Sequence, residues 1–506
     1  MKICFINPPS QYGRAPLPHM GIAYIAGMLK HSFPNAVTDL IDCPFQDINA
    51  EDMKKKTVDE EYDVIGITTY FYNFTEVFKL VRFLNKQKKK PFIVLGGYYP
   101  TLHPKKTFDI PGIDCICIGE GEYVFKELIE TLMEKRDWRG INGLSYMDEQ
   151  NNLVQNKVDL LIEKLDELPR PYLASAPPYW FPLVSGRGCH GHCTFCSIID
   201  YYQKVPGKRI RKRCPLGVVE ELKEITDQYK NRIIWMMDDN FFSVLQFQPE
   251  WIDEFVAQMQ LREVRCKFKI FARADEVDKE ILMKLKSVGL TGVVVGVESM
   301  LERQLKLYGK NINPQVNRRA LQIIRETGLW LDMGFILLDP FTTLDELKVN
   351  LQFLRDSPFV DSSEPGHELI SSLGPLIVLE DTPIHRYLSK QNILSGTDVG
   401  YNYQSDEITF FHKSLKTWNK MIADMYFGFN KKYLFDYYRE HGTIQEDYIR
   451  RYKKCLRIDI ECMYEILECL YRQPIRQIQI ETLLEKYKKR FQAVIQEETL
   501  EDVINC

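Results

Sequence analysis

Short apolar runs without polar alternation recur along this chain, and a helical pattern follows nearly every one of them. Strands that alternate with helices in this way form parallel sheets whose two faces are both covered by helices. A proline-containing stretch at residues 146–178 interrupts the alternation, which then resumes. We therefore expect an α/β fold with two successive sheets joined by a linker, and the length of 506 residues suits about three domains of ~150 residues each.

The first alternating part, residues 1–145, predicts a doubly wound, Rossmann-like parallel sheet. Its strands are expected at residues 2–7, 37–43, 62–70, 91–99 and 113–122. Apolar residues at helical spacing predict helices at residues 21–33, 75–87 and 123–135. Such sheets bind ligands outside the carboxyl ends of their strands, so the loops at those ends are the candidate site.

Small and hydroxyl-bearing residues gather in these loops. They follow the third, fourth and fifth strands as Thr68, Thr69, Gly96, Gly97 and the run Gly119-Glu120-Gly121-Glu122. One interpretation is that the glycines only make tight turns. The other is that they let a flat, bulky ligand approach the backbone, which glycine permits because it has no Cβ. Small residues at all three strand ends together favour the ligand.

The second alternating part, residues 179–394, contains six further strand–helix units. Its strands are expected at residues 179–187, 232–239, 266–275, 291–299, 330–340 and 367–379. Charged residues fall at their C-terminal ends, where barrels of such units carry functional residues. The last segment, residues 395–506, has aromatic-rich helical patterns and predicts a small helical domain.

Composition excludes several classes of protein. Hydrophobic residues make up 45% of the chain and charged residues 27%, as in folded soluble proteins. The net charge of −4 does not imply a broad nucleic-acid-binding surface, and no apolar run approaches the ~18 residues that span a bilayer. The chain start lacks a secretory pattern, so we expect a cytoplasmic protein. Its 13 cysteines are then not a disulfide framework.

Three cysteines, Cys189, Cys193 and Cys196, lie within eight residues. A structural zinc site needs four protein ligands, and the next cysteine, Cys214, lies beyond a basic stretch. A 4Fe-4S cluster on three thiolates keeps one iron open, which a catalytic cluster needs because a substrate binds there. Zinc binding and chance clustering are the alternatives.

Five runs in the first part occur in a recognisable order: INPP…GIAYIAGML, LIDC, YDVIGITT, VLGGYYPTLHP and CICIGEGE. In sequence and spacing this part resembles the N-terminal domain of cobalamin-binding radical S-adenosylmethionine (SAM) enzymes. The resemblance implies that cobalamin is bound by the strand-end loops, through Thr68, Thr69, Gly96, Gly97, Tyr98, Thr101, Gly119, Glu120, Gly121 and Glu122.

One departure from other cobalamin domains concerns the cobalt ligand. Those domains have an Asp-x-His-x-x-Gly motif after the first strand, and its histidine ligates cobalt. The loop here, NPPSQYGRAPLP, lacks the motif, so the resemblance implies cobalamin without a protein histidine on cobalt. The nearby His19 and His103 are interpreted as hydrogen-bonded surface or turn residues. His190 and His192, which flank the cysteines, are interpreted as polar loop residues.

The spacing C-x3-C-x2-C, with the aromatic Phe195 before the last cysteine, is similar to the signature of the radical SAM family. Later runs, MMDDNFF, FARAD, GVES, LYGKN and TPIHRYL, resemble motifs of its cobalamin-dependent subgroup. The resemblance implies a half-closed, TIM-like (β/α)6 barrel, with Cys189, Cys193 and Cys196 on a 4Fe-4S cluster and SAM on the open iron.

By the same resemblance, SAM would be contacted by Phe195, Asp238, Arg273 and Glu298. A guanidinium suits a carboxylate, and a carboxylate suits ribose or amino hydrogens. The alternative for Arg273 and Glu298 is an ion pair at the barrel mouth. The fifth strand departs from the family, because LLDPFTT with Asp339 stands where relatives have a glycine-rich turn.

Three further cysteines, Cys455, Cys462 and Cys469, recur every seven residues in a helical pattern. Successive thiols two turns apart would be separated by ~10 Å, too far for all three to reach one compact cluster. We interpret them as buried residues on a helix seam.

The resemblance implies an enzyme with three cofactors: a 4Fe-4S cluster, SAM and cobalamin. The favoured function is a methyltransferase that cleaves SAM reductively to a 5′-deoxyadenosyl radical and methylates an unactivated carbon through methylcobalamin. A cobalamin-linked rearrangement, cyclisation or oxidation without methyl transfer is the alternative, and a cobalamin or metal sensor is a third. The expected partners are a small-molecule or peptide substrate and an electron donor such as flavodoxin or ferredoxin.

Overall fold

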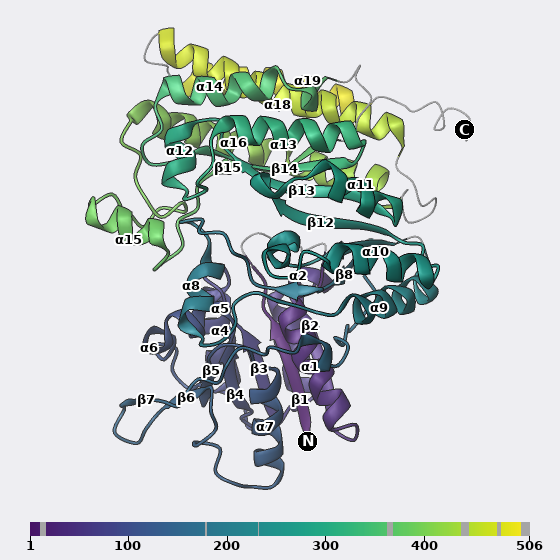
Figure 1. Ribbon diagram of the computed structural model, residues 1–506. Coiled ribbons are helices and arrows are strands. Elements are labelled where there is room, and N and C mark those ends of the chain that lie inside the picture. The colour runs from purple at the N-terminus through teal and green to yellow at the C-terminus, as the bar shows by residue number, and fades with distance from the viewer. Residues whose placement is uncertain are drawn as a thin grey trace, which may run out of the picture. The chain divides into compact units, whose positions relative to one another are not determined.

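The computed structural model describes residues 1–10, 17–177, 180–230, 232–361, 368–436, 445–472 and 477–496 (Figure 1). The chain divides into two compact units. The first unit comprises Met1–His190, Cys196–Val218 and Met237–Asp239. The second comprises Gly191–Phe195, Val219–Met236 and the residues from Asn240 onward. The domain boundaries at residues 145, 178 and 394 stay predictions.

The first unit is built on a seven-stranded sheet in the order β2-β1-β3-β4-β5-β6-β7. Its strands are β1 (Lys2–Asn7), β2 (Val37–Asp42), β3 (Val64–Thr68), β4 (Phe92–Gly96), β5 (Cys115–Cys117), β6 (Leu144–Met147) and β7 (Leu153–Gln155). The first five strands are parallel, which confirms the predicted sheet.

The last two strands differ from the prediction. β6 and β7 pair antiparallel and extend the sheet into the stretch that was expected to be a linker. Both strands are short, at four and three residues, and they are only partly buried. Strands of this length lack the continuous apolar run that identifies a buried parallel strand, so the sequence pattern does not distinguish them from a loop.

Helices cover both faces of this sheet because successive side chains of each strand point to opposite sides. Phe5 of β1 packs on one face with the helices α1 and α7, while its neighbour Ile6 packs on the other face with α4. Each fully buried side chain of this size contributes about 1.5–3 kcal/mol of transfer free energy. The helices of this region are α1 (Met20–Ser32), α2 (Cys43–Gln46), α3 (Ala50–Asp59), α4 (Phe74–Leu84), α5 (Tyr98–Leu102), α6 (Pro104–Thr107) and α7 (Glu122–Met133).

A short β-hairpin-like pair leads into the cysteine segment. β9 (Gly186–Arg187) pairs antiparallel with β10 (Arg211–Lys212), and α8 (Ser197–Lys204) lies between them in the chain. Residues 188–196, here called the cluster loop, have no helix or strand of their own. The loop is therefore anchored at its start by β9 and followed at its end by α8.

A second sheet has six strands in the order β15-β14-β13-β12-β11-β8. They are β8 (Trp180–Leu183), β11 (Ile233–Met236), β12 (Lys267–Arg273), β13 (Leu290–Glu298), β14 (Trp330–Leu338) and β15 (Glu368–Pro375). The sheet neighbours follow the order of the chain, and the four pairs from β11 to β15 are parallel. This arrangement confirms the predicted partial barrel.

Helices connect these strands, and their ends carry the expected caps. α13 (Pro314–Thr327) begins after Asn313, whose side chain accepts from the amide of Val316, and ends at Gly328 with φ of 65°. α14 (Leu344–Arg355) begins with a reciprocal capping box between Thr343 and Glu346. The other helices of this part are α9 (Pro215–Gln228), α10 (Trp251–Leu261), α11 (Lys279–Ser287), α12 (Glu302–Leu307) and α15 (Pro383–Lys390).

Among the described residues after 395 there are three long helices: α16 (Asp406–Asn430), α18 (Glu446–Arg472) and α19 (Gln477–Ile495). α18 runs alongside α14 in the second unit (Figure 1). Cys455 and Cys462 are completely buried in α18 and Cys469 is half-buried, as expected of a helix seam. Among the described helices, none is both long and apolar enough to cross a membrane.

Candidate cofactor sites

A cavity of about 440 Å³ lies at the carboxyl edge of the seven-stranded sheet in the first unit. Eight of the ten residues predicted to contact cobalamin line it: Thr68, Gly96, Gly97, Tyr98, Gly119, Glu120, Gly121 and Glu122. Thr69 and Thr101 are buried beside it and do not line it. The residues chosen from the sequence thus lie around one cavity, although their contacts with cobalamin stay predictions.

The cavity floor depends on backbone that only glycine adopts without strain. Gly97 has φ of 98°, and a Cβ there would lie 3.0 Å from Oγ1 of Thr68. The hydroxyl of Thr101 donates to the carbonyl of Gly97 at 2.9 Å and accepts from the amide of Gly119 at 3.0 Å. Thr101 therefore ties the β4 and β5 loops together from behind the cavity.

His19 lies in the cavity wall, but its ring nitrogens have other partners. Its Nδ1 accepts from the amide of Ile22 at 3.3 Å, and its Nε2 lies 2.7 Å from the hydroxyl of Tyr70 and 3.3 Å from that of Thr68. Because Nδ1 accepts, Nε2 carries the proton and donates to Tyr70. Burial lowers the pKa of His19, so the neutral ring is favoured.

Tyrosines provide much of the remaining wall. The ring of Tyr70 stacks on that of Tyr72, with 5.0 Å between centroids, and Tyr98 packs against Tyr201 of α8 at 4.8 Å. Tyr70 and Tyr201 were not predicted as site residues from the sequence, because an aromatic residue in a loop or helix usually belongs to the core. Tyr201 lies in the cavity wall because α8 packs near the carboxyl edge of the sheet.

The cavity lining fits cobalamin. Glycine backbone and aromatic faces offer a flat, largely uncharged surface for a macrocycle, and backbone can approach it closely. The engaged nitrogens of His19 agree with a cobalt that takes no histidine from the protein. These observations concern the residues of the first unit.

The donor set of the cluster loop fits a 4Fe-4S cluster with one open iron. Cys189, Cys193 and Cys196 form no disulfide, and each is half-buried. In the described part of the chain, no three His, Cys, Asp or Glu side chains converge closely enough to hold a metal ion. The loop that carries the three thiols has no helix or strand of its own.

Four carboxylates hold the segment directly before Cys189, residues 185–188. Asp238 accepts from the amides of Ser185 and Gly186 at 2.7 and 2.9 Å, and Asp239 accepts from the amide of Gly188 at 2.7 Å. The other two, Glu120 and Glu122, bind the guanidinium of Arg187 at 2.9 and 2.5 Å. Every residue of this segment thus has an acidic partner within the first unit.

Asp238 was predicted to contact SAM, and the structure shows other partners for its carboxylate. Besides the two amides, Asp238 accepts from the hydroxyl of Ser185 at 2.6 Å and from the ammonium of Lys212 at 2.6 Å. Burial lowers the pKa of Lys212, whereas Asp238 opposes this effect. The SAM contact of Asp238 stays a prediction; its observed contacts hold the start of the cluster loop.

In the second unit, Arg273 at the end of β12 reaches the cluster loop. Its guanidinium binds Asp275 through two hydrogen bonds of 3.0 Å and donates to the carbonyl of Lys310 at 2.9 Å. The remaining Nη1 donates to Sγ of Cys193 at 3.5 Å. The ion pair with Asp275 is the alternative that the sequence left open, and it fixes the plane of the guanidinium.

The middle of the cluster loop is anchored by the run Leu307–Lys310 through its backbone. Thr194 donates from its amide to the carbonyl of Tyr308 at 2.9 Å and from its hydroxyl to that of Leu307 at 2.7 Å. A Cβ on Gly309, whose φ is 65°, would lie 2.6 Å from the carbonyl oxygen of His192. The adjacent Phe195 packs edge-on against the ring of Tyr308.

Glu298 ends β13 in an unusual backbone conformation. Its φ is 65°, which is rare for a residue with a side chain, and the strand register shifts at this point. The side-chain amide of Asn317 donates from Nδ2 to the carbonyls of Val297 and Ser299, both at 2.9 Å, and holds this bulge. Such strain is frequent at ligand sites, and Lys310 pairs with the carboxylate at 3.4 Å.

Asp339, which replaces the family's glycine-rich turn, is completely buried. Its carboxylate pairs with Arg303 at 3.0 Å and accepts from the hydroxyl of Tyr308 at 3.3 Å and from the amide of Phe341 at 2.8 Å. Asp339 thereby links the turn after β14 to the residue that anchors Thr194. Asp339, at which the sequence departs from the family, therefore has its own hydrogen-bond partners in this protein.

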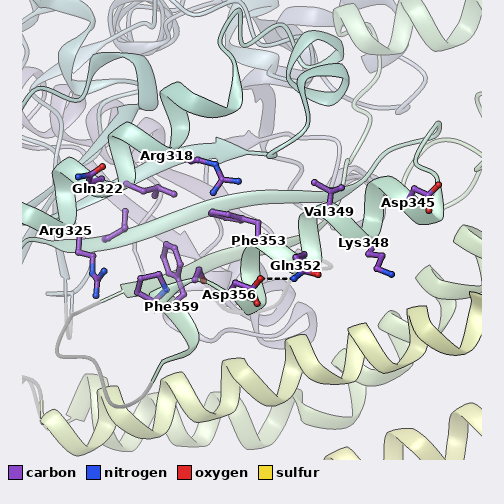
Figure 2. A pocket seen from close by; sticks show the side chains of 14 residues that line it. Arg318, Gln322, Arg325, Asp345, Lys348, Val349, Gln352, Phe353, Asp356 and Phe359 are labelled. Atoms are coloured by element: carbon purple, nitrogen blue, oxygen red, sulfur yellow. Dashed lines mark hydrogen bonds between the residues drawn. The ribbon is translucent and has the colours of Figure 1, made fainter.

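Another cavity, of about 800 Å³, lies in the second unit between α13 and α14 (Figure 2). Arg318 lies over the ring of Phe353, with 5.3 Å from the guanidinium carbon to the ring centroid. The lining comes from the two helices, the start of β14 and residues 356–359. It contains none of the predicted site residues, and β14 contributes its amino end rather than the end where barrels carry catalytic groups.

Comparisons with known proteins agree with this geometry. The B12 binding domain family matches residues 14–129, and the Radical SAM superfamily matches residues 183–354. An uncharacterised methyltransferase of Pyrococcus horikoshii, PH0819, is 28% identical over 371 residues, which cover 70% of this chain and 78% of the relative.

Two further comparisons concern other reactions and the fold. The anaerobic magnesium-protoporphyrin IX monomethyl ester cyclase of Rubrivivax gelatinosus is 24% identical over 381 residues, which cover 70% of this chain and 66% of the cyclase. The structure of the cobalamin-dependent S-adenosylmethionine radical enzyme OxsB superposes with a TM-score of 0.71 at 19% identity. The superposition covers 99% of this chain and 84% of OxsB, so the two proteins share a fold.

Proposed function

Because this chain belongs to the radical SAM superfamily and carries a B12-binding domain before its radical SAM domain, we propose that it methylates an unactivated carbon of its substrate. The observation that carries this proposal is the shared location of two features in the first unit. A glycine-lined cavity and the segment before Cys189 are joined there through Arg187, which lines the cavity. A methyl carrier and a radical source that act on one substrate carbon need such proximity.

When bound, the cluster supplies the electron that cleaves SAM to a 5′-deoxyadenosyl radical, and cobalamin supplies the methyl group. The protein has to hold both cofactors and exclude water from the reacting carbon. Cys189, Cys193 and Cys196 would hold the cluster, and the cavity of the first unit would hold cobalamin. Arg273 and Glu298 would bind the polar groups of SAM beside their present partners, Asp275 and Lys310.

The test of the proposal is the set of products that the full-length protein forms. Protein reconstituted anaerobically with iron, sulfide and hydroxocobalamin is reduced and incubated with SAM. We expect both 5′-deoxyadenosine and S-adenosylhomocysteine, since methyl transfer consumes one SAM as a methyl donor and cleaves another. A triple variant of Cys189, Cys193 and Cys196 to Ala is the control and should form no 5′-deoxyadenosine.

A second candidate is a radical cyclisation, rearrangement or oxidation without methyl transfer. The similarity to a cyclase over 70% of this chain favours it. The same incubation distinguishes the two reactions, because 5′-deoxyadenosine without S-adenosylhomocysteine supports this candidate and contradicts the methyltransferase. For either reaction we propose a small-molecule or peptide substrate and a flavodoxin or ferredoxin as the electron donor.

A further inference from the structure

Arg187 connects the cavity of the first unit to the cluster loop. Its Nη1 donates to Oε1 of Glu120 at 2.9 Å and its Nη2 donates to Oε1 of Glu122 at 2.5 Å, so one guanidinium spans both carboxylates. The side chains of Glu120, Glu122 and Arg187 are only 7%, 5% and 15% exposed. The guanidinium also lies over the ring of Tyr24 at 5.3 Å.

A second arginine shares one of these carboxylates. Oε2 of Glu120 accepts from Nη1 of Arg211 at 2.7 Å and from the amide of Ile162 at 2.7 Å. Arg211 stands opposite Arg187 in the β9–β10 pair and lies over the ring of Tyr202. Two arginines and two glutamates therefore form one buried, charge-balanced network, here called the arginine–glutamate clamp, which comprises Glu120, Glu122, Arg187 and Arg211.

The two ends of this clamp belong to different parts of the sequence. The glutamates stand in the Gly-Glu-Gly-Glu run after β5, which lines the cavity, whereas Arg187 lies two residues before Cys189. Gly188, which lies between Arg187 and Cys189, has φ of 95°, and a Cβ there would lie 2.0 Å from the carbonyl oxygen of Arg209. The chain from Arg187 to Cys189 therefore has little freedom to move independently of the clamp.

The glutamates are poorly placed to act as simple ligands of the corrinoid. Glu120 uses both carboxylate oxygens on the protein, and Glu122 is bound by Arg187 at short range. Breaking a buried ion pair on one side leaves an uncompensated charge, so these contacts persist when the cavity is filled. Glu120 and Glu122 therefore act on the corrinoid through the position of the cluster loop.

We propose that Glu120 and Glu122 are positioning residues that set the start of the cluster loop through Arg187, so that filling the cavity and binding the cluster favour each other. This inference rests on the proposed function, because it assumes that this chain binds both cofactors. The coupling is reciprocal: if the cluster tightens cobalamin binding, cobalamin tightens cluster binding by the same factor.

The test measures the dissociation constant of hydroxocobalamin for the full-length protein by absorbance titration, with and without the reconstituted cluster. For the wild type we expect the cluster to tighten binding about tenfold, within the usual range of such couplings. Glu122→Gln removes the charge that binds one side of Arg187 and keeps the shape. Arg187→Met removes the bridge itself. In both variants we expect the two dissociation constants to become equal within about twofold.

Two further proteins control for nonspecific effects. Glu127→Gln makes the same change on the exposed side of α7 and should keep the wild-type coupling. The double variant Glu122→Gln with Arg187→Met should show no larger loss than Arg187→Met alone, because both changes remove the same contact. Circular dichroism on each variant verifies folding, and the milder Glu122→Gln alone suffices if Arg187→Met does not fold.

The outcomes separate this inference from the proposed function. Equal dissociation constants in the wild type, or full coupling in a folded Glu122→Gln protein, overturn the inference alone. Wild-type protein that binds no iron–sulfur cluster or no hydroxocobalamin overturns the proposed function and the inference with it. Loss of coupling in Glu122→Gln with its retention in Glu127→Gln supports the arginine–glutamate clamp.

Discussion

The guanidinium of Arg273 donates a hydrogen bond from Nη1 to the sulfur of Cys193 at 3.5 Å. The same guanidinium is fixed by two hydrogen bonds to Asp275 and one to the carbonyl of Lys310. Hydrogen bonds to thiolate sulfur stabilise the more negative, reduced state of an iron–sulfur cluster. Arg273 is therefore placed to tune the potential of the cluster as well as to bind SAM.

Replacing Arg273 by Lys should lower the reduction potential of the reconstituted cluster. Lysine keeps the charge but loses the planar fork that holds Asp275 and points Nη1 at the sulfur. Loss of one hydrogen bond of about 1 kcal/mol corresponds to a shift of some tens of millivolts for a one-electron couple. A redox titration followed by EPR measures it. The exposed Arg265→Lys should leave the potential unchanged, and an unchanged potential in Arg273→Lys would show that this contact is absent from the loaded protein.

Gly188→Ala should destabilise the start of the cluster loop. Its φ of 95° is unfavourable for a residue with a side chain, and an added Cβ would lie 2.0 Å from the carbonyl oxygen of Arg209, which leaves no space for a methyl group. We expect a loss of about 1–3 kcal/mol in unfolding free energy and less bound iron after reconstitution. Urea denaturation and iron analysis measure both. Gly140→Ala is the matched control, since a Cβ there meets nothing within 4 Å, and equal behaviour of the two variants would refute the steric argument.

The cobalt in this protein should carry no histidine nitrogen. Both nitrogens of His19 are engaged within the protein, Nδ1 by the amide of Ile22 and Nε2 by the hydroxyl of Tyr70. We expect the EPR spectrum of bound cob(II)alamin to be identical in unlabelled protein and in protein labelled with 15N-histidine. A change in the superhyperfine splitting on labelling would show that a histidine of the chain ligates cobalt.

Asp459 should make the stability of the C-terminal helices depend on pH. Burial raises the pKa of Asp459 to about 8, although the indole of Trp418, which donates to it at 3.1 Å, favours the charged form. An unfolded aspartate has a pKa near 3.9. Between pH ~4 and ~8 the native state therefore keeps a proton that the unfolded chain has lost, and stability falls as pH rises through this window.

Asp459→Asn removes this titration, so the stability of the variant should fall less steeply as pH rises. The urea midpoints of variant and wild type should lie closest at pH 5 and diverge in favour of the variant towards pH 8. Asp424→Asn, on the exposed side of α16, should follow the wild type. Parallel curves for Asp459→Asn and the wild type would contradict a raised pKa.

The order of elements was predictable because each buried parallel strand is a continuous apolar run followed by an amphipathic helix. The short strands β6 and β7 were not, since they are partly exposed and bear no such run. The edge of the sheet that holds the cavity was also predictable, because glycines at Gly97 and Gly119 mark positive φ at strand ends.

The partners of charged residues were much harder to predict. Glu120 and Arg187 are 67 positions apart, and nothing in either local pattern indicates that they pair. The same holds for Asp238, for which the family resemblance implied a SAM contact and whose carboxylate binds Ser185, Gly186 and Lys212. Periodicity reports which face of an element is buried, but the approach of two loops depends on the packing of the whole chain.

We infer that one iron of the cluster has no side-chain ligand and binds SAM. EPR of the reduced, reconstituted protein before and after addition of SAM measures this binding at the cluster itself. We expect SAM to change the g-values of the cluster signal, because its amino and carboxylate groups bind the open iron. A spectrum that SAM leaves unchanged, in protein shown to contain the cluster, would show that SAM does not bind an open iron.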